Sequence, residues 1–137
     1  MKDNVIVRGI TLKDYEFINK WWEDSGYGIV DKKYLPDNGL GGLIVEKNGV
    51  PLAAAYTYTT NSRVCYMDNL VSNFNYKGRD RYLLIKKLFD TVINRAKECG
   101  CEMLWTLSTT RDRGIVKRCA ELGCQISDEP YYIISTR

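Results

Sequence analysis

The feature that most limits what this chain can fold into is a long amphipathic segment that follows three strand-like segments. Between residues 81 and 98, apolar side chains recur at positions 84, 88, 92 and 96, the spacing of one helical face. Gly100 then ends the pattern, as glycine commonly does after a helix. Upstream, the Asn48-Gly49 dipeptide is typical of a two-residue β-hairpin turn. This order predicts an antiparallel meander whose third strand leads into a long helix.

The rest of the chain continues the alternation of strands and helices. We expect one helix from Thr11 to about Gly26, and another at 111–122, while residues 27–41 form a loop that leaves room for one short helical turn. Because a helical crossover joins parallel strands, the strand after residue 98 is expected to lie parallel to the third meander strand. The ranges expected to form strands are 4–10, 43–46, 51–59, 64–71, 102–107 and 131–135.

Together these segments predict a single domain over residues 1–137, of the α/β class, with an α+β mixed sheet and helices on both faces. Thr11 and Asp14 have the spacing of a capping box at the start of the first helix. Trp21 and Trp22 lie further along that helix. We interpret both tryptophans as core residues, with the wall of a binding pocket as the alternative.

The composition excludes several classes of site. The chain has no histidine, which removes Ser-His-Asp and Cys-His catalysis and the usual ligand sets of structural zinc, so no metal site is predicted. The net charge of +3 is too small to predict nucleic-acid binding. The basic stretch 77–97 also lacks the interleaved aromatic residues of a single-strand binding platform.

The cysteines and the hydropathy pattern bear on the compartment. The five cysteines are odd in number and lie in apolar segments, where a free cysteine acts as a small hydrophobe. No apolar run approaches the roughly 20 residues that span a bilayer, and the N-terminus lacks the apolar stretch of a signal peptide. These observations predict a cytoplasmic protein without a membrane partner, and they leave a homodimer open.

The stretch YKGRDRYLLIKKL joins the third strand-like segment to the long helix. In it, Gly78 stands among Lys77, Arg79 and Arg81. A helix N-terminus presents unpaired amide groups and about half a positive charge, which suits a phosphate, and arginine binds phosphate in bidentate fashion. The stretch therefore predicts an anion site. The alternative is a solvated basic turn in which Asp80 caps the helix.

The order of elements, with this turn in its place, resembles the GNAT (Gcn5-related N-acetyltransferase) family. DNLVSNFNYKG is similar to the family's lead-in to its cofactor turn, and CAELGC to the end of its last helix. The resemblance covers nearly the whole chain. It implies the order β-α-β-β-β-α-β-α-β and a mostly antiparallel sheet splayed at the cofactor site. It also implies acetyl-CoA as cofactor, with direct acetyl transfer to a primary amine of a small molecule or peptide.

In that family the backbone amides of the turn bind the diphosphate of acetyl-CoA, and a backbone amide of the preceding strand polarises the thioester carbonyl. The cofactor-binding residues that the resemblance implies are Leu70, Val71, Lys77, Gly78, Arg79, Asp80, Arg81 and Tyr82.

The sequence departs from the family's pattern at several positions. Asp80 and Tyr82 stand where small residues are usual, and Lys77 replaces an arginine or glutamine. Asp112 and Cys119 align with an asparagine and with a tyrosine that protonates the departing thiolate, and we expect Cys119 to be structural and buried. These departures keep open the alternative of a catalytically inactive acyl-CoA-binding or regulatory module on the same fold.

The catalytic and acceptor residues are less constrained by the sequence. Asp68 and Glu46 are carboxylates expected on strands, and each is a candidate general base, with an ion pair or backbone contact as the alternative. Tyr56 and Tyr58, on one face of a strand, and Tyr34 in the loop are candidates for the acceptor pocket. A tyrosine combines an apolar body with a polar tip, as an amine-binding wall requires.

Overall fold

The computed structural model describes residues 3–106, 117, 120 and 121. The chain divides into two compact units, Met1–Leu107 and Ser108–Arg137, and the first contains the sheet. Of the helix predicted at 111–122, the described residues 117, 120 and 121 are helical. The rest of that helix, the strand predicted at 131–135 and both Asp112 and Cys119 lie outside the described residues.

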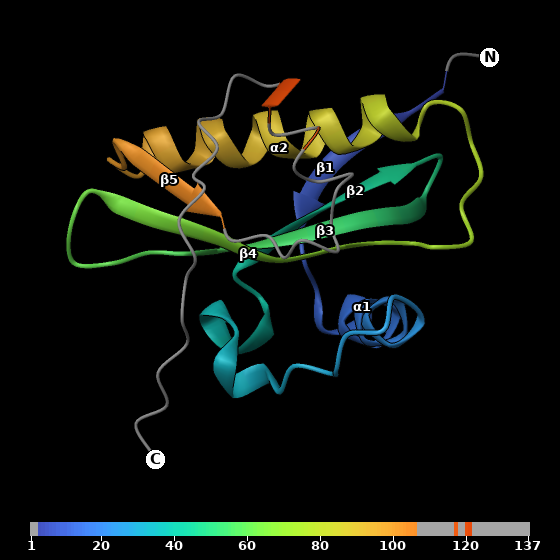
Figure 1. Cartoon of the computed structure of the whole chain (residues 1–137), viewed down its shortest axis with the longest axis horizontal. Coiled ribbons are helices and arrows are strands. Elements are labelled where there is room, and N and C mark those ends of the chain that lie inside the picture. Colours follow the sequence, from blue (N-terminus) through green and yellow to red (C-terminus); the bar gives the residue numbers. More distant parts are fainter. Residues whose placement is uncertain (1–2, 107–116, 118–119, 122–137) are drawn as a thin grey trace. The chain divides into compact units, whose positions relative to one another are not determined.

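A five-stranded mixed sheet forms the centre of the first unit (Figure 1). Its strands lie side by side in chain order, and each neighbouring pair is antiparallel except the last, which is parallel. The strands are β1 (Val5–Gly9), β2 (Gly42–Lys47), β3 (Val50–Tyr58), β4 (Val64–Ser72) and β5 (Met103–Thr106). The predicted meander and the parallel strand after the crossover helix are both confirmed.

Two helices cover opposite faces of this sheet, α1 (Leu12–Asp24) and α2 (Arg81–Glu98) (Figure 1). The bounds of α2 are those expected from its apolar spacing. The loop between α1 and β2 contains two short 3-10 helices, η1 (Lys32–Tyr34) and η2 (Pro36–Gly39), where one helical turn was expected. None of the helices among the described residues combines the length and apolar character that a membrane crossing requires.

The start of α1 is tied to the sheet by a buried carboxylate. One oxygen of Asp14 accepts hydrogen bonds from the backbone N–H of Thr11 at 2.7 Å and from its hydroxyl at 3.0 Å. The Arg8 guanidinium of β1 donates to both Asp14 oxygens, at 2.7 and 3.0 Å, and its Nε donates to Glu46 of β2 at 2.9 Å. The predicted capping pair therefore also fixes the start of α1 to β1, and Arg8 extends this contact to β2.

Each face of the sheet has its own apolar core. On one face, Ile18 and Trp22 of α1 lie in a buried cluster with Ile44, Tyr56 and Val71 of the sheet. On the other face, α2 lies against β2 and β3. The buried residues of α2 are Leu84, Leu88, Phe89, Val92 and Ala96. The interpretation of Trp21 and Trp22 as core residues is confirmed, since they are 5% and 2% exposed.

The turn between β2 and β3 is the predicted two-residue hairpin. Asn48 and Gly49 have φ angles of 52° and 81°, and they connect the paired residues Lys47 and Val50. Two successive positive φ angles are the property of a type I′ turn, which Asn-Gly favours. The hairpin fixes Lys47 as the last residue of β2.

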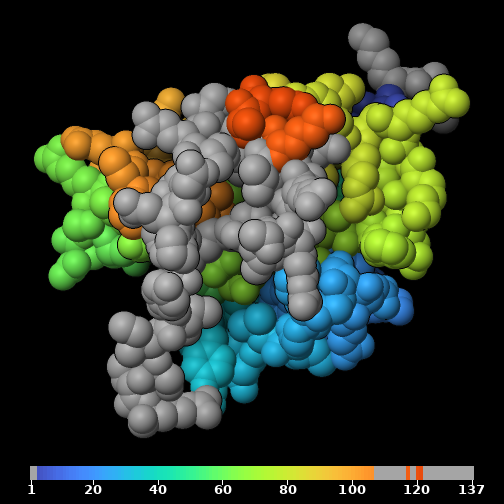
Figure 2. Space-filling model, in the orientation of Figure 1, coloured from blue at the N-terminus to red at the C-terminus, as the bar shows by residue number. Residues whose placement is uncertain are grey.

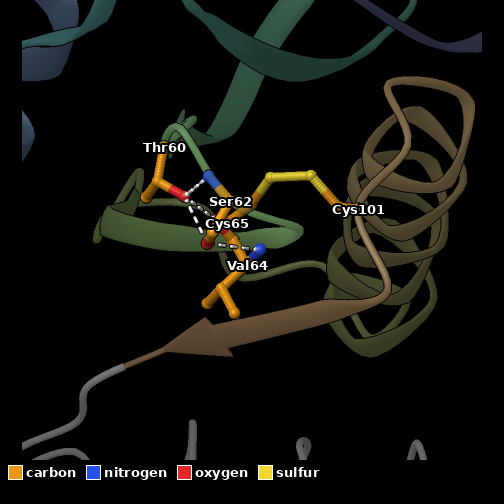
Figure 3. The surroundings of a disulfide bond; sticks show 5 residues. All are labelled: Thr60, Ser62, Val64, Cys65 and Cys101. Carbon is orange, nitrogen blue, oxygen red and sulfur yellow. Dashed lines mark hydrogen bonds between the residues drawn. A yellow bond between two sulfur atoms is a disulfide. The ribbon is translucent and has the colours of Figure 1, made fainter.

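A disulfide bond joins Cys65 of β4 to Cys101, two residues before β5 (Figure 3). Cys65 is buried, and Cys99 is the exposed free cysteine among those that the structure describes. The expectation of reduced cysteines is therefore wrong for this pair. Beside the bond, the Thr60 hydroxyl donates to the Val64 carbonyl at 2.7 Å and closes the turn that begins β4 (Figure 3).

Candidate cofactor and acceptor site

A β-bulge interrupts β4 next to the predicted cofactor residues. Ala54 is paired with Val71, and Tyr56 with Asp68, so two steps along β3 match three steps along β4. Asn69 lies within this extra length and has a φ of 55°. Such a bulge bends its strand and disturbs the hydrogen-bond ladder locally. The bulge lies next to Leu70 and Val71, the cofactor residues expected on β4.

Side chains hold the bulge in this conformation. The Asn69 side-chain amide donates to the Tyr58 hydroxyl at 2.6 Å, and that hydroxyl donates to the Tyr34 carbonyl at 3.1 Å. Asp68 accepts the backbone N–H of Asn69 at 2.7 Å. Tyr58 therefore connects the bulge to η1. Asn69 was not predicted from the sequence, although asparagine is among the few residues that adopt positive φ readily.

The two candidate bases differ in their surroundings. Asp68 is exposed on β4, whereas the Glu46 side chain is 14% exposed and bound by Arg8. A base that must take a proton from an amine would have to leave this ion pair, so the structure does not support Glu46 in that role. The carboxylates of Asp68 and Glu46 also lie far from each other in the sheet. Gly42 and Asp68 both pair with Tyr56, and Glu46 lies four residues, about 13 Å, further along β2.

The three candidate acceptor tyrosines also differ in how exposed they are. Tyr56 is 0% exposed, its ring lies 6.3 Å from that of Trp22, and its hydroxyl donates to the Gly39 carbonyl at 3.3 Å. Burial raises the pKa of Tyr56. The structure therefore corrects Tyr56 from pocket wall to core residue. Tyr34 is 55% exposed and Tyr58 is half-buried, so both have surface to offer to a ligand.

The connection from β4 to α2 is organised by Arg81. Its guanidinium donates to the carbonyl oxygens of Asn73 and Tyr76, each at 3.1 Å, and to the Ser72 hydroxyl. The Arg81 guanidinium therefore holds the connection together, and the structure does not support it as a side chain that binds phosphate. These bonds also fix the first residue of α2 beside the last residue of β4, directly after the bulge.

Lys77 and Arg79 are the exposed cations of the turn, which lies on the surface in yellow-green in Figure 2. The Lys77 ammonium lies 5.0 Å from the centre of the Phe74 ring. Tyr82 follows in the first turn of α2 and is half-buried. Lys77 and Arg79 together supply the exposed positive charge of this turn.

Asp80 precedes α2, but it does not act as the expected side-chain cap. Its carboxylate makes no capping hydrogen bond within the described part of the chain. One oxygen accepts the Lys47 ammonium at 2.6 Å, and the other accepts the Tyr76 hydroxyl. The bonds from Lys47 and Tyr76 hold the pKa of Asp80 below its usual range. Lys47 was missed because it lies 33 residues away in the sequence.

Gly78 lies underneath this contact. A Cβ atom at position 78 would lie 2.2 Å from the Tyr76 hydroxyl oxygen and 2.6 Å from Asp80 Oδ1. Both distances are far below van der Waals contact, so any side chain would separate Tyr76 from Asp80 or displace the backbone. The glycine leaves room for the close approach of these two side chains.

No protein-family model and no curated relative matches the sequence. Solved structures do match. An aminoglycoside N-acetyltransferase, AAC(6')-Iy, in complex with CoA is 14% identical with a TM-score of 0.72, over 100% of this chain and 98% of that one. The ribosomal-protein-S18-alanine N-acetyltransferase of Escherichia coli is 15% identical with a TM-score of 0.71, over 88% and 77%.

A third similar structure is described as a transcriptional regulator from Bacillus halodurans C-125. It is 13% identical with a TM-score of 0.72, and the match covers 96% of this chain and 100% of that one. Identities this low show a shared fold alone. The chain has the fold of the GNAT N-acetyltransferases.

Proposed function

We propose that this protein is an acetyl-CoA-dependent N-acetyltransferase that moves an acetyl group directly to a primary amine. The observation that carries the proposal is the glycine turn at the start of the 18-residue helix α2, braced by Arg81 against the end of the bulged strand β4. A similar structure with this fold holds CoA. Other comparably similar structures are N-acetyltransferases by description.

The turn has the properties that a diphosphate site needs. Backbone amides at the start of a long helix attract phosphate, and Lys77 and Arg79 add exposed positive charge. The Asp80 carboxylate is the one group of the turn that would repel phosphate. It forms an ion pair with the Lys47 ammonium. The pantetheine arm of the cofactor would then follow β4, where the Leu70 or Val71 backbone amide polarises the thioester carbonyl.

The transfer itself needs few side chains. Acetyl-CoA supplies an activated acetyl group, and the chain holds this group and the amine in one cleft, so that proximity provides much of the rate. The nitrogen–carbon bond forms as the carbon–sulfur bond breaks, and the electron pair leaves on sulfur. A thiolate whose conjugate acid has a pKa of about 8.5 is a tolerable leaving group. Asp68 takes the amine proton directly or through water.

The acceptor site is proposed beside the bulge. Asp68 offers a carboxylate, and Tyr58 and Tyr34 offer aromatic surface and polar tips next to it. An amine that is positively charged in solution suits this combination of groups. We therefore propose a small-molecule or peptide amine as the acceptor.

The test is the release of the CoA thiol from acetyl-CoA, measured against a panel of polyamines, aminoglycosides, lysine peptides and peptides with free N-termini. The proposal predicts release that depends on the amine and saturates with it. A second candidate function is a binding or regulatory module, which the similarity to a structure described as a transcriptional regulator favours. That candidate predicts a raised melting temperature with acetyl-CoA and no amine-dependent release.

The compartment is proposed to be the cytoplasm, and the disulfide offers a test. Disulfides persist mainly in oxidising environments, so a cytoplasmic protein would carry Cys65 and Cys101 as thiols at the contact that the structure records as a bond. Alkylation of the protein in intact cells, followed by mass spectrometry, distinguishes the two states. Alkylated Cys65 and Cys101 would support the cytoplasm, and a protected pair would count against it.

A further inference from the structure

We propose that Lys47 is a positioning residue for the diphosphate of acetyl-CoA, which acts by holding the Asp80 carboxylate away from the phosphate site and cancelling its charge. The inference rests on the proposed function. It assigns a role in cofactor binding to a residue at the end of β2, far along the chain from the turn that binds the cofactor.

The contact between Lys47 and Asp80 is well defined. Both oxygens of Asp80 are used, one by the Lys47 ammonium at 2.6 Å and one by the Tyr76 hydroxyl. The Lys47 side chain is 22% exposed and that of Asp80 30% exposed, so the ion pair is partly shielded from water. The hairpin at Asn48-Gly49 fixes the backbone of Lys47, which makes the lysine a rigid point of attachment for the turn.

Without Lys47, the Asp80 carboxylate would be available to the backbone of the first turn of α2. A carboxylate just before a helix normally accepts backbone N–H groups of the first turn and is attracted by the helix dipole. Those are the groups that a bound phosphate would use. In the described part of the chain Asp80 makes no such capping bond, because Lys47 and Tyr76 hold its carboxylate instead. Lys47 thereby removes a competitor for the diphosphate.

Lys47 also affects the net charge of the turn. Lys47 also lies 3.3 Å from Asp3, so it is bound by two carboxylates and is not itself a spare cation for a ligand. The exposed positive charge of the turn comes from Lys77 and Arg79. If Lys47 were absent, Asp80 would offset one of these two charges. Lys47 therefore preserves the attraction of the turn for phosphate without needing to touch the phosphate.

The same network explains why an aspartate can stand where the family usually has a small residue. A small residue leaves room for the cofactor by having no side chain to intrude. Here Asp80 is turned toward Lys47 and lies over Gly78, where a Cβ would be 2.6 Å from its oxygen. The aspartate is accommodated by an ion pair that the strand β2 provides.

The test is calorimetric titration of CoA into the full chain and four variants. Lys47→Gln should weaken CoA binding about tenfold or more, because it leaves a carboxylate unpaired beside the diphosphate. Asp80→Asn removes the repelling carboxylate and keeps the Lys47 ammonium, so it should bind CoA at least as tightly as the wild type does. The double variant Lys47→Gln with Asp80→Asn should regain most of the affinity that Lys47→Gln loses. Lys20→Gln is the matched control, since Lys20 forms an exposed ion pair with Asp24 on α1.

Recovery in the double variant is the outcome that a merely structural role for Lys47 would not produce. Equal weakness of Lys47→Gln and the double variant would overturn the proposal, because Lys47 would then act independently of Asp80. Unchanged binding by Lys47→Gln would also overturn it while leaving the proposed function intact. No binding by the wild-type protein would overturn both.

A further variant covers the case in which Lys47→Gln does not fold. Lys47→Arg keeps the positive charge and can still reach a carboxylate, so it should bind CoA as the wild type does. A tenfold loss in folded Lys47→Arg would contradict a role that depends on charge. Circular dichroism and the melting temperature without CoA establish that each variant is folded.

Discussion

At the scale of single residues, Gly78 is a position of the turn where any side chain would meet its neighbours. Its missing side chain admits the contact between Tyr76 and Asp80. We predict that Gly78→Val weakens CoA binding at least tenfold, about 1.4 kcal/mol, by calorimetry. Gly28→Ala is the control, since a Cβ there meets nothing within 4 Å among the described atoms. Equal affinity of a folded Gly78→Val protein would remove the turn from the cofactor site.

Asp68 supports the second prediction at this scale. Asp68→Asn should lower kcat about a hundredfold, the usual size of a lost general base, and leave CoA affinity unchanged. Glu46→Gln is the matched control, because Glu46 is bound by Arg8 and its replacement should affect stability more than turnover. If Glu46→Gln slows turnover more than Asp68→Asn does, the assignment of the base is wrong.

The residue scale is also where the sequence was least informative. Lys77, Gly78 and Arg79 were found because their signal is local, a basic glycine turn before a helix. Lys47 was not, since its contact with Asp80 depends on how β2 lies against α2 in the folded chain. Tyr56 looked like a pocket residue because the period of two in a strand does not say which face a helix will cover.

At the scale of elements, the anchoring of α1 supports the third prediction. Burial alone would raise the pKa of Asp14, but the hydrogen bonds from Arg8 and Thr11 outweigh it and lower the pKa. Asp14 therefore stabilises the fold above its unfolded pKa of about 3.9, and this contribution is lost as the pH falls through the lower folded value.

Asp14→Asn should lower the free energy of unfolding by about 2 kcal/mol at pH 7, where a charged hydrogen bond is lost. The difference from the wild type should shrink as the pH falls below about 4. Urea unfolding of both proteins at a series of pH values measures it. A difference that stays constant down to pH 2 would show that the carboxylate charge does not contribute.

The elements with strong local signals were predictable. The range of α2 followed from its apolar spacing, and the β2–β3 hairpin followed from Asn48-Gly49. The bulge in β4 was not predictable as a position, because one extra residue in a strand leaves little mark on the pattern. Asn69 lies in the bulge and has a positive φ. This conformation cannot be inferred from the sequence without the pairing of β4 with β3.

At the scale of the whole molecule, the disulfide supports the fourth prediction. Cys65 and Cys101 close a loop with a sequence separation of 36, for which chain entropy gives about 3–4 kcal/mol of stabilisation. Urea unfolding of the purified, air-oxidised protein with and without reductant should show a difference of this size in the wild type and none in Cys65→Ala with Cys101→Ala. Cys99→Ala should behave as the wild type does. A wild type indifferent to reductant would show that the bond does not form.

The sheet and the helices of the first unit were predictable from the order of elements, since a meander followed by a crossover helix admits few arrangements. The disulfide was not predictable. Five cysteines in apolar segments look like core residues, and only the parallel pairing of β4 with β5 brings Cys65 close to Cys101. Cys119 aligns by resemblance with the family's proton-donating tyrosine, and the expectation that Cys119 is structural and buried concerns a residue outside the described ones and stays a prediction.

The most direct test of the central claim is a crystal structure of the protein with acetyl-CoA. The account predicts that the diphosphate lies against the backbone of residues 78–82 and the thioester beside Leu70 and Val71, with Asp80 still bound to Lys47. Acetyl-CoA bound elsewhere, or a turn that stays empty at saturating acetyl-CoA, would contradict the claim that this turn is the cofactor site.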